Sequence, residues 1–197
     1  MSIRERIGLL YIDDDRDEAI SAYLEDDYRN EQYDIEYKEL GFEADQGYES
    51  LLDSPDVAAA NVILIDSQLF ENDRLKYKGK FTGEEFRMLL RKVFPFIEVL
   101  VISQNGENKE FDIVPKYRSG SSETSLQYYK RILEPKINEC IQRIITFRNI
   151  SKKLENNDRV EKYLVDKTVE SLNGINIYDD LSKKDIDDLI TAFQNMG

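Results

Sequence analysis

Three short runs of apolar residues constrain the fold of this chain more than any other feature. They read IGLLYI at residues 7–12, VILI at 62–65 and IEVLVI at 97–102, the last interrupted only by Glu98. Runs that are continuously apolar, rather than alternating, are typical of strands buried on both faces of a parallel sheet. Polar side chains follow each run at once, beginning with Asp13, Asp66 and Ser103. The runs therefore predict interior strands that end at polar loops.

Helical patterns separate these strands along the chain. Apolar residues at three- and four-residue spacing predict helices at 19–24, 48–52, 86–93 and 126–133. Alternation with period two predicts a strand at 33–40, and a short last strand is expected at 111–116. Pro95 closes the third helix, and Ser121 or Ser122 can cap the fourth. Five such units predict an α/β fold, a doubly wound parallel sheet with helices on both faces.

The last third of the chain is predicted to be helical. Pro135 suits the first turn of a helix better than its interior, so a new helix is expected to begin there. A further helix is expected before Gly174, and a last one from Ser182, where Asp185 stands in the capping-box position. The chain is thus divided into a sheet domain, residues 1–134, and a helical extension, residues 135–197, for output, dimerisation or partner binding.

The composition excludes several classes of function. The chain contains no histidine, which removes Ser–His and Cys–His catalysis and every histidine metal site. Its single cysteine, Cys140, cannot form an internal disulfide and is expected to be a core residue. A formal charge of −13 argues against general nucleic-acid binding, so DNA is not expected as a partner. Without a signal peptide or an apolar run of roughly 20 residues, we expect a cytoplasmic protein with no membrane span.

Aspartates crowd at the ends of two predicted strands. Asp13, Asp14 and Asp15 follow the first strand, and Asp66 ends the third. Ligands of a doubly wound sheet bind beyond the carboxyl ends of its strands, so neighbouring first and third strands would bring Asp13, Asp14 and Asp66 together. Such carboxylates repel one another unless a cation lies among them, and Mg²⁺ is served well by oxygen ligands. Alternatively, the first three aspartates only cap the following helix.

Four motifs, in order along the chain, resemble those of the receiver domain of two-component response regulators. They are YIDDD, VILIDSQ, VLVISQ and DIVPK, and they supply Asp13, Asp14, Asp66, Ser103 and Lys116. That family has an acidic pair after its first strand, an aspartate after the third, Ser or Thr after the fourth and lysine after the fifth. The resemblance covers about residues 5–134 and implies a flavodoxin-like sheet with strand order 2-1-3-4-5.

The resemblance implies a phosphoacceptor protein rather than an enzyme. Asp66 would take a phosphoryl group from a histidine kinase or phosphotransfer protein, and Ser103 and Lys116 would bond the phosphoryl oxygens. Mg²⁺ would be held by four oxygen donors, those of Asp13, Asp14, Asp66 and the carbonyl of Gln68. A downstream protein target would receive the signal by protein–protein interaction, and the C-terminal helices would offer a surface for a homodimer.

Several departures from the family pattern affect the surface that usually transmits the signal. Gly83 follows the phosphoacceptor only after a longer insertion. Twelve residues separate Ser103 from Lys116, so the fourth helix of the family is expected to be missing or reduced to a turn. Tyr117 stands after the lysine where the family has a proline, and Ile113 replaces the aromatic residue of the fifth strand.

Two functions of different classes follow from these observations. The first is a phosphorylated receiver whose helical extension is the output or dimerisation element. The second is a pseudo-receiver, an adaptor that keeps the fold and binds partners but is not phosphorylated. A Mg²⁺-dependent phosphatase is a weaker alternative, because Gln68 occupies the place of the second acid that such enzymes need. A dinucleotide-binding enzyme is weaker still, because no glycine-rich turn follows the first strand.

Overall fold

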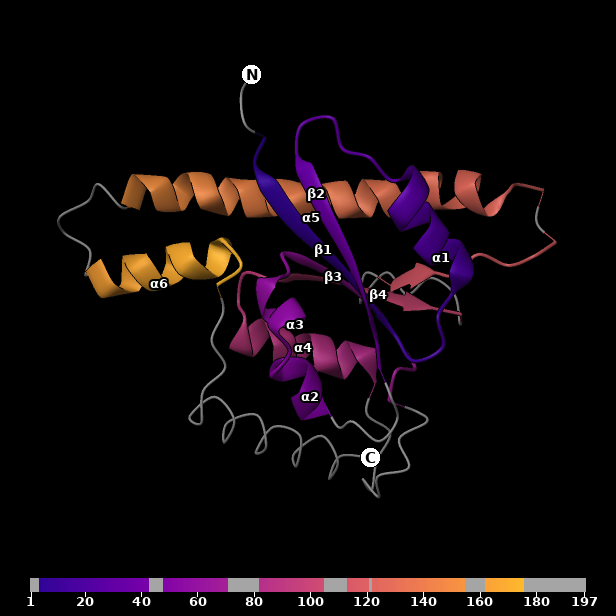
Figure 1. Ribbon diagram of the computed structural model, residues 1–197, viewed down its shortest axis with the longest axis horizontal. Helices are drawn as coiled ribbons and strands as arrows, with labels where there is room; N and C mark the ends of the chain where they lie inside the picture. The colour runs from indigo at the N-terminus through magenta and orange to yellow at the C-terminus, as the bar shows by residue number, and fades with distance from the viewer. Residues whose placement is uncertain are drawn as a thin grey trace.

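A single parallel sheet forms the centre of the protein in a computed structural model (Figure 1). The structure describes residues 4–42, 48–70, 82–104, 113–120, 122–154 and 162–175. The strands are β1 (Arg6–Asp13), β2 (Asp34–Gly41), β3 (Val62–Asp66), β4 (Glu98–Ser103) and β5 (Ile113–Pro115). They follow the order β2-β1-β3-β4-β5, and every neighbouring pair is parallel. The predicted flavodoxin-like α/β fold and its strand order are confirmed.

Helices cover both faces of the sheet. One face carries α1 (Glu18–Ala22), its continuation as a π-helical turn, η1 (Tyr23–Asp27), and α5 (Ser125–Leu154). The other face carries α2 (Tyr48–Leu52), α3 (Pro55–Ala59) and α4 (Gly83–Val93). The last described helix, α6 (Lys162–Leu172), lies beside the C-terminal part of α5 (Figure 1). These are the two covering layers that a doubly wound sheet requires.

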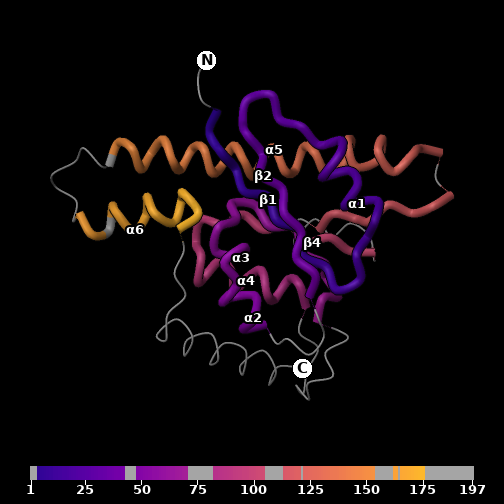
Figure 2. The backbone as a smooth tube through the Cα atoms, viewed as in Figure 1, coloured from indigo at the N-terminus to yellow at the C-terminus, as the bar shows by residue number. Residues whose placement is uncertain are grey.

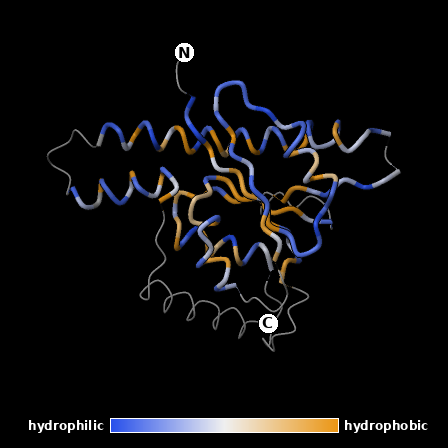
Figure 3. Tube along the Cα trace, viewed as in Figure 1, coloured by the Kyte–Doolittle hydropathy of each residue, from blue (hydrophilic) through white to orange (hydrophobic). Residues whose placement is uncertain are grey.

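Successive strand residues point into two separate cores. Leu10 and Ile63 belong to the core under α2, α3 and α4, whereas Leu9 and Leu64 belong to the core under α1 and α5. All residues of β3 and β4 are buried, and Figure 3 shows that the central strands are the most hydrophobic part of the chain. Burial on both faces explains why these strands are continuously apolar between their polar end residues, Glu98 of β4 and Asp66 and Ser103 at the carboxyl ends.

The helix α5 is a single helix of 30 residues, and it continues through Pro135. The helix start predicted at Pro135 is therefore wrong. The carbonyl that this proline leaves without an intrahelical partner belongs to Arg131, and both residues are exposed, so water can satisfy the carbonyl. Leu133 and Ile137 pack on the sheet on either side of the proline and hold the helix together. The division expected between residues 134 and 135 falls inside α5 (Figure 2).

Other helix ends agree in part with the predictions. The predicted cap of α5 at Ser122 is wrong, because Thr124 and Gln127 form the capping pair, and the alternative cap, Ser121, lies outside the described residues. Thr124 Oγ1 accepts from the Gln127 N–H at 3.3 Å, and Gln127 Oε1 accepts from the Thr124 N–H at 3.0 Å. Gly174 follows the end of α6 and has a φ of 78°, a left-handed conformation that glycine often adopts just after a helix. This agrees with the prediction of a helix that ends before Gly174. The last predicted helix, from Ser182, and most of the β4–β5 connection, residues 105–112, lie outside the described residues.

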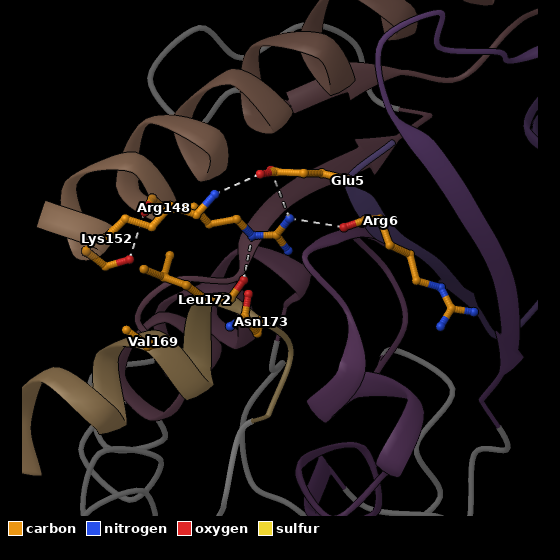
Figure 4. Close-up of a pocket in the computed structure, with 8 residues that line it drawn as sticks. Glu5, Arg6, Arg148, Lys152, Val169, Leu172 and Asn173 are labelled. Carbon is orange, nitrogen blue, oxygen red and sulfur yellow. Dashed lines mark hydrogen bonds and ion pairs between the residues drawn. The ribbon is translucent and has the colours of Figure 1, made fainter. Parts of the chain in front are cut away.

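A buried arginine joins α5 and α6 to the amino-terminal edge of the sheet (Figure 4). Arg148 is 8% exposed, and it donates to the carbonyls of Arg6 at 3.0 Å and Leu172 at 2.9 Å, and to Asn61 Oδ1 at 3.2 Å. Burial lowers the pKa of Arg148, and the nearby Glu5 opposes this. Since Arg6 begins β1, Asn61 precedes β3 and Leu172 ends α6, this Arg148 network fixes three elements to one side chain.

Two features of the composition can be compared with the structure. Cys140 is fully buried in the core under α5, as expected of a small apolar residue. Among the described residues, no helix is both long and apolar enough to cross a membrane.

Candidate functional site

Three aspartates meet at the carboxyl edge of the sheet. Asp13 ends β1, Asp14 follows it, and Asp66 ends β3, the neighbour of β1. One carboxylate oxygen of each lies within 4.8 Å of the others. Asp13 and Asp66 are each 5% exposed, and Asp14 is half-buried. The parallel pairing of β1 with β3 thus brings together acids that are far apart in the sequence, and we call these three residues the acidic site.

Lys116 places its ammonium group between two of these acids. The Nζ atom lies 2.8 Å from Asp66 Oδ1 and 3.0 Å from Asp13 Oδ2, and the side chain is 8% exposed. The backbone N–H of Lys116 donates to the carbonyl of Ser103 at 2.8 Å, so the end of β4 fixes where the lysine leaves the sheet. One positive charge therefore stands against the two buried negative charges of Asp13 and Asp66.

The electrostatics of this group favour an additional cation. Burial raises the pKa of Asp66, and the charge of Asp13 adds to this, while Lys116 lowers it. Burial lowers the pKa of Lys116, but its hydrogen bonds and charge interactions with Asp66 and Asp13 raise it overall, so the lysine stays charged. Three carboxylates around one ammonium leave negative charge uncompensated. The acidic site can therefore hold a metal ion, and its all-oxygen donor set suits a hard divalent cation.

Backbone groups orient the two buried carboxylates. Asp66 Oδ2 accepts from the Gln68 N–H at 2.7 Å, and Asp13 Oδ1 accepts from the Asp15 N–H at 3.0 Å. In each aspartate, one oxygen faces Lys116 and the other is held by the loop that follows its own strand. Gln68 thus lies at the site through its N–H, and the metal-binding role of its carbonyl stays a prediction.

Ser103 lies at the same edge of the sheet. It ends β4, and it is buried one residue beyond Ile102, which is paired with Asp66 in the register of β3 and β4. The strand order thus places Ser103, Asp66 and Lys116 on three successive neighbouring strands or their ends. The contact of Ser103 with a phosphoryl oxygen stays a prediction.

Tyr11 is a residue of this site that the sequence did not single out. Its hydroxyl donates to Asp13 Oδ2, the oxygen that Lys116 also contacts. Tyr11 is fully buried and lies two residues before Asp13, hence on the same face of β1. In the sequence it is one member of an apolar run. The only signal was a side chain with a polar tip placed two residues before a strand-ending acid.

Gly83 lies against Asp66 in spite of the insertion between them. It begins α4, and its N–H donates to the carbonyl of Ser67 at 3.0 Å. A Cβ atom on Gly83 would lie 2.5 Å from the carbonyl oxygen of Asp66. Only glycine allows the start of α4 to come this close to the backbone at the end of β3.

We expect Gly83→Ala to lower the free energy of unfolding by about 1–3 kcal/mol, because the added methyl group must displace the Asp66 backbone or the start of α4. Urea unfolding of the full chain measures this loss. Gly41→Ala is the matched control, because a Cβ at Gly41 meets no atom within 4 Å and this residue has no positive φ. Equal losses in the two variants would contradict the proposed close approach.

Tyrosines hold the loop that carries Lys116. The N–H of Tyr117 donates to the hydroxyl of Tyr129 at 3.0 Å, and the hydroxyl of Tyr128 donates to the carbonyl of Pro115 at 3.0 Å. The rings of Tyr117 and Tyr128 are in edge-to-face contact, with centroids 5.7 Å apart. The residue that departs from the receiver pattern, Tyr117, is thus anchored to the first turns of α5.

Comparisons with protein-family models, with curated proteins and with solved structures find no match to this chain. The fold and the site themselves define the class of protein. It is an α/β protein with a flavodoxin-like parallel sheet and, at the carboxyl edge of that sheet, a buried acidic group able to hold a metal ion.

Proposed function

We propose that the protein is an atypical receiver that accepts a phosphoryl group on Asp66 in the presence of Mg²⁺ and signals through protein–protein interaction. The observation that carries the proposal is the position of Lys116, whose Nζ atom lies 2.8 Å from Asp66 and 3.0 Å from Asp13. Phosphoryl transfer needs fixed positive charge beside the acceptor and a metal site close to it, and this arrangement supplies both.

The resemblance to receiver domains implies a phosphohistidine as the donor, and since this chain contains no histidine, that histidine belongs to another molecule. A carboxylate oxygen of Asp66 attacks the phosphorus atom; the new P–O bond forms as the P–N bond breaks, and the imidazole leaves with the electron pair. Lys116 and Ser103 bond the phosphoryl oxygens. Asp13, Asp14 and Asp66 of the acidic site, together with the carbonyl of Gln68, would hold Mg²⁺, which would offset the negative charge on those oxygens when bound.

Phosphorylation changes the charge of the site, and this is the basis of the signal. The phosphoryl group brings about two negative charges to a position that is already acidic. Lys116 must then be shared between the phosphoryl group and Asp13, and the tyrosines that hold its loop connect it to α5. The extension formed by the rest of α5 and α6 is the proposed output, dimerisation or partner-binding element, and the protein acts on its target without being an enzyme.

We expect the wild-type protein to gain one phosphoryl group when it is incubated with Mg²⁺ and acetyl phosphate, and Asp66→Asn to gain none. Intact-mass spectrometry measures the gain, and Mg²⁺-dependent binding of beryllofluoride provides a second measurement. Asp56→Asn is the matched control, because Asp56 is a partly exposed carboxylate paired with Lys38, and we expect the variant to be modified like the wild type. Modification of Asp66→Asn to the wild-type extent would rule out Asp66 as the acceptor.

An adaptor that is never phosphorylated is the second candidate. The observation in its favour is the anchoring of Tyr117, whose hydroxyl donates to the carbonyl of Glu123 at 2.9 Å and whose N–H is bonded to Tyr129. A loop held in this way opposes the movement of Lys116 that a switch requires. Absence of an adduct and of Mg²⁺ binding at millimolar concentration, in a folded wild-type protein, would favour the adaptor.

A further inference from the structure

We propose that Tyr11 is a positioning residue of the metal site, whose hydroxyl holds the Asp13 carboxylate in the orientation that binds the divalent cation. The inference rests on the proposed function, because it concerns the Mg²⁺ ion that this function requires.

The hydroxyl of Tyr11 approaches the acidic site from the interior of the protein. Tyr11 is fully buried, and its side chain belongs to the core between the sheet and the helices α1 and α5, the core that also contains Ile20 and Tyr129. A ring enclosed on all sides keeps one orientation, so the hydroxyl at its tip is fixed as well. That hydroxyl donates to Asp13 Oδ2.

Asp15, Lys116 and Tyr11, all among the described residues, donate hydrogen bonds to the Asp13 carboxylate, and we expect these donors to respond differently to a cation. Asp15 donates its backbone N–H to Oδ1 at 3.0 Å, whereas Lys116 and Tyr11 both donate to Oδ2. A divalent cation among the carboxylates would repel the ammonium of Lys116 and so would weaken the Lys116–Asp13 contact. Tyr11 is uncharged, so its hydrogen bond would be retained and would continue to fix Oδ2.

A neutral donor of this kind is suited to a ligating carboxylate. Groups that hydrogen-bond a metal ligand from outside set its orientation, and their loss typically weakens metal binding about 10- to 100-fold. A purely structural role is the rival explanation, because any buried tyrosine hydroxyl needs a partner. The two explanations differ in one measurable quantity. A structural role lowers stability only, whereas a positioning role lowers the affinity for the metal in a protein that remains folded.

The test is a calorimetric titration of the full chain with Mg²⁺ alone. We expect Tyr11→Phe to bind Mg²⁺ at least about tenfold more weakly than the wild type. The matched control is Tyr28→Phe, which removes another buried tyrosine hydroxyl, one that donates to Asn138 Oδ1 at 2.9 Å and does not contact the acids. The control should bind as the wild type does. In an Asp13→Asn background, Tyr11→Phe should cause no further loss, because its effect passes through Asp13.

Each other outcome overturns the inference. Unchanged or tighter Mg²⁺ binding by Tyr11→Phe overturns it and leaves the proposed function intact, as does an equal loss in Tyr28→Phe. A Tyr11→Phe protein that fails to fold, judged by circular dichroism, also overturns it, because the hydroxyl would then serve stability. A wild-type protein that binds no Mg²⁺ overturns the inference and the proposed function together. Where the wild type binds Mg²⁺ and only the result for Tyr11→Phe contradicts the inference, phosphorylation of Asp66 shows that the proposed function still holds.

Discussion

Replacement of Lys116 by methionine is expected to lower the free energy of unfolding by about 3–5 kcal/mol at pH 7, because it leaves the buried carboxylates of Asp13 and Asp66 without their shared counter-charge. The ammonium lies within 3.0 Å of both, and the three side chains are nearly inaccessible to water. Methionine fills a similar volume, so the loss reports on charge rather than on a cavity. Urea unfolding measures it.

The Lys116→Met variant should also respond to pH. Burial raises the pKa of Asp66 and Lys116 lowers it, so removing the lysine raises the Asp66 pKa further. A group whose pKa is raised in the folded state stabilises that state at low pH and loses this effect as the pH rises through the folded pKa. The deficit of the variant should therefore shrink as the pH falls from about 7 to about 5.

Two comparisons make this result specific. Lys130→Met changes an exposed lysine of α5, and we expect no measurable loss of stability from it. Millimolar Mg²⁺ should stabilise Lys116→Met more than the wild type, because the cation no longer competes with the ammonium. A Lys116→Met protein as stable as the Lys130→Met control, with no response to pH or Mg²⁺, would show that the lysine does not compensate the acids.

The second large effect is expected from Arg148→Met, which should lower the free energy of unfolding by about 3 kcal/mol or more. The substitution removes one donor from each of three acceptors: the carbonyls of Arg6 and Leu172, and Asn61 Oδ1. Asn61 Oδ1 keeps the N–H of Gly8 at 3.0 Å, and the Leu172 carbonyl keeps only a longer hydrogen bond from Asn61 Nδ2 at 3.5 Å. Because Leu172 ends α6, we expect the amides of α6 to lose protection before those of the sheet. Hydrogen exchange followed by mass spectrometry resolves the two regions.

Arg148→Lys should not restore stability, because a single ammonium cannot reach three acceptors that the planar guanidinium reaches together. Lys152→Met, one turn further along α5, is the control for this position. Lys152 is exposed and pairs with Glu5 at 2.9 Å, and such surface pairs contribute little. Equal protection of α6 in Arg148→Met and in the control would contradict the role given to the Arg148 network.

The architecture of the sheet followed from local patterns in the sequence. Continuous apolar runs predicted β3 and β4 as interior strands, and the structure buries every residue of both. The meeting of Asp13 with Asp66 needed only one further step, because parallel strands place their carboxyl ends at one edge. The sequence therefore predicted well the features that depend only on the positions of the strands, namely the sheet and the meeting of Asp13 with Asp66.

The remaining features depend on contacts between distant segments. Arg148 reaches Arg6, 142 residues away, and nothing near either residue marks this hydrogen bond. The hydroxyl of Tyr11 is directed to Asp13 by the packing of its ring under α1 and α5. Pro135 appeared to start a helix because local rules take no account of the packing that holds α5 together on both sides of it.

The continuity of α5 determines how this protein can be cut. A fragment that ended at residue 134 would retain the five described strands but lose much of the apolar cover of one sheet face. The lost side chains are Ile137, Cys140, Ile141 and Ile144, all of which are buried against that face. Such a fragment would expose a large apolar surface and aggregate. A proteolytic fragment or recombinant piece that keeps the acidic site intact should therefore include the whole of α5.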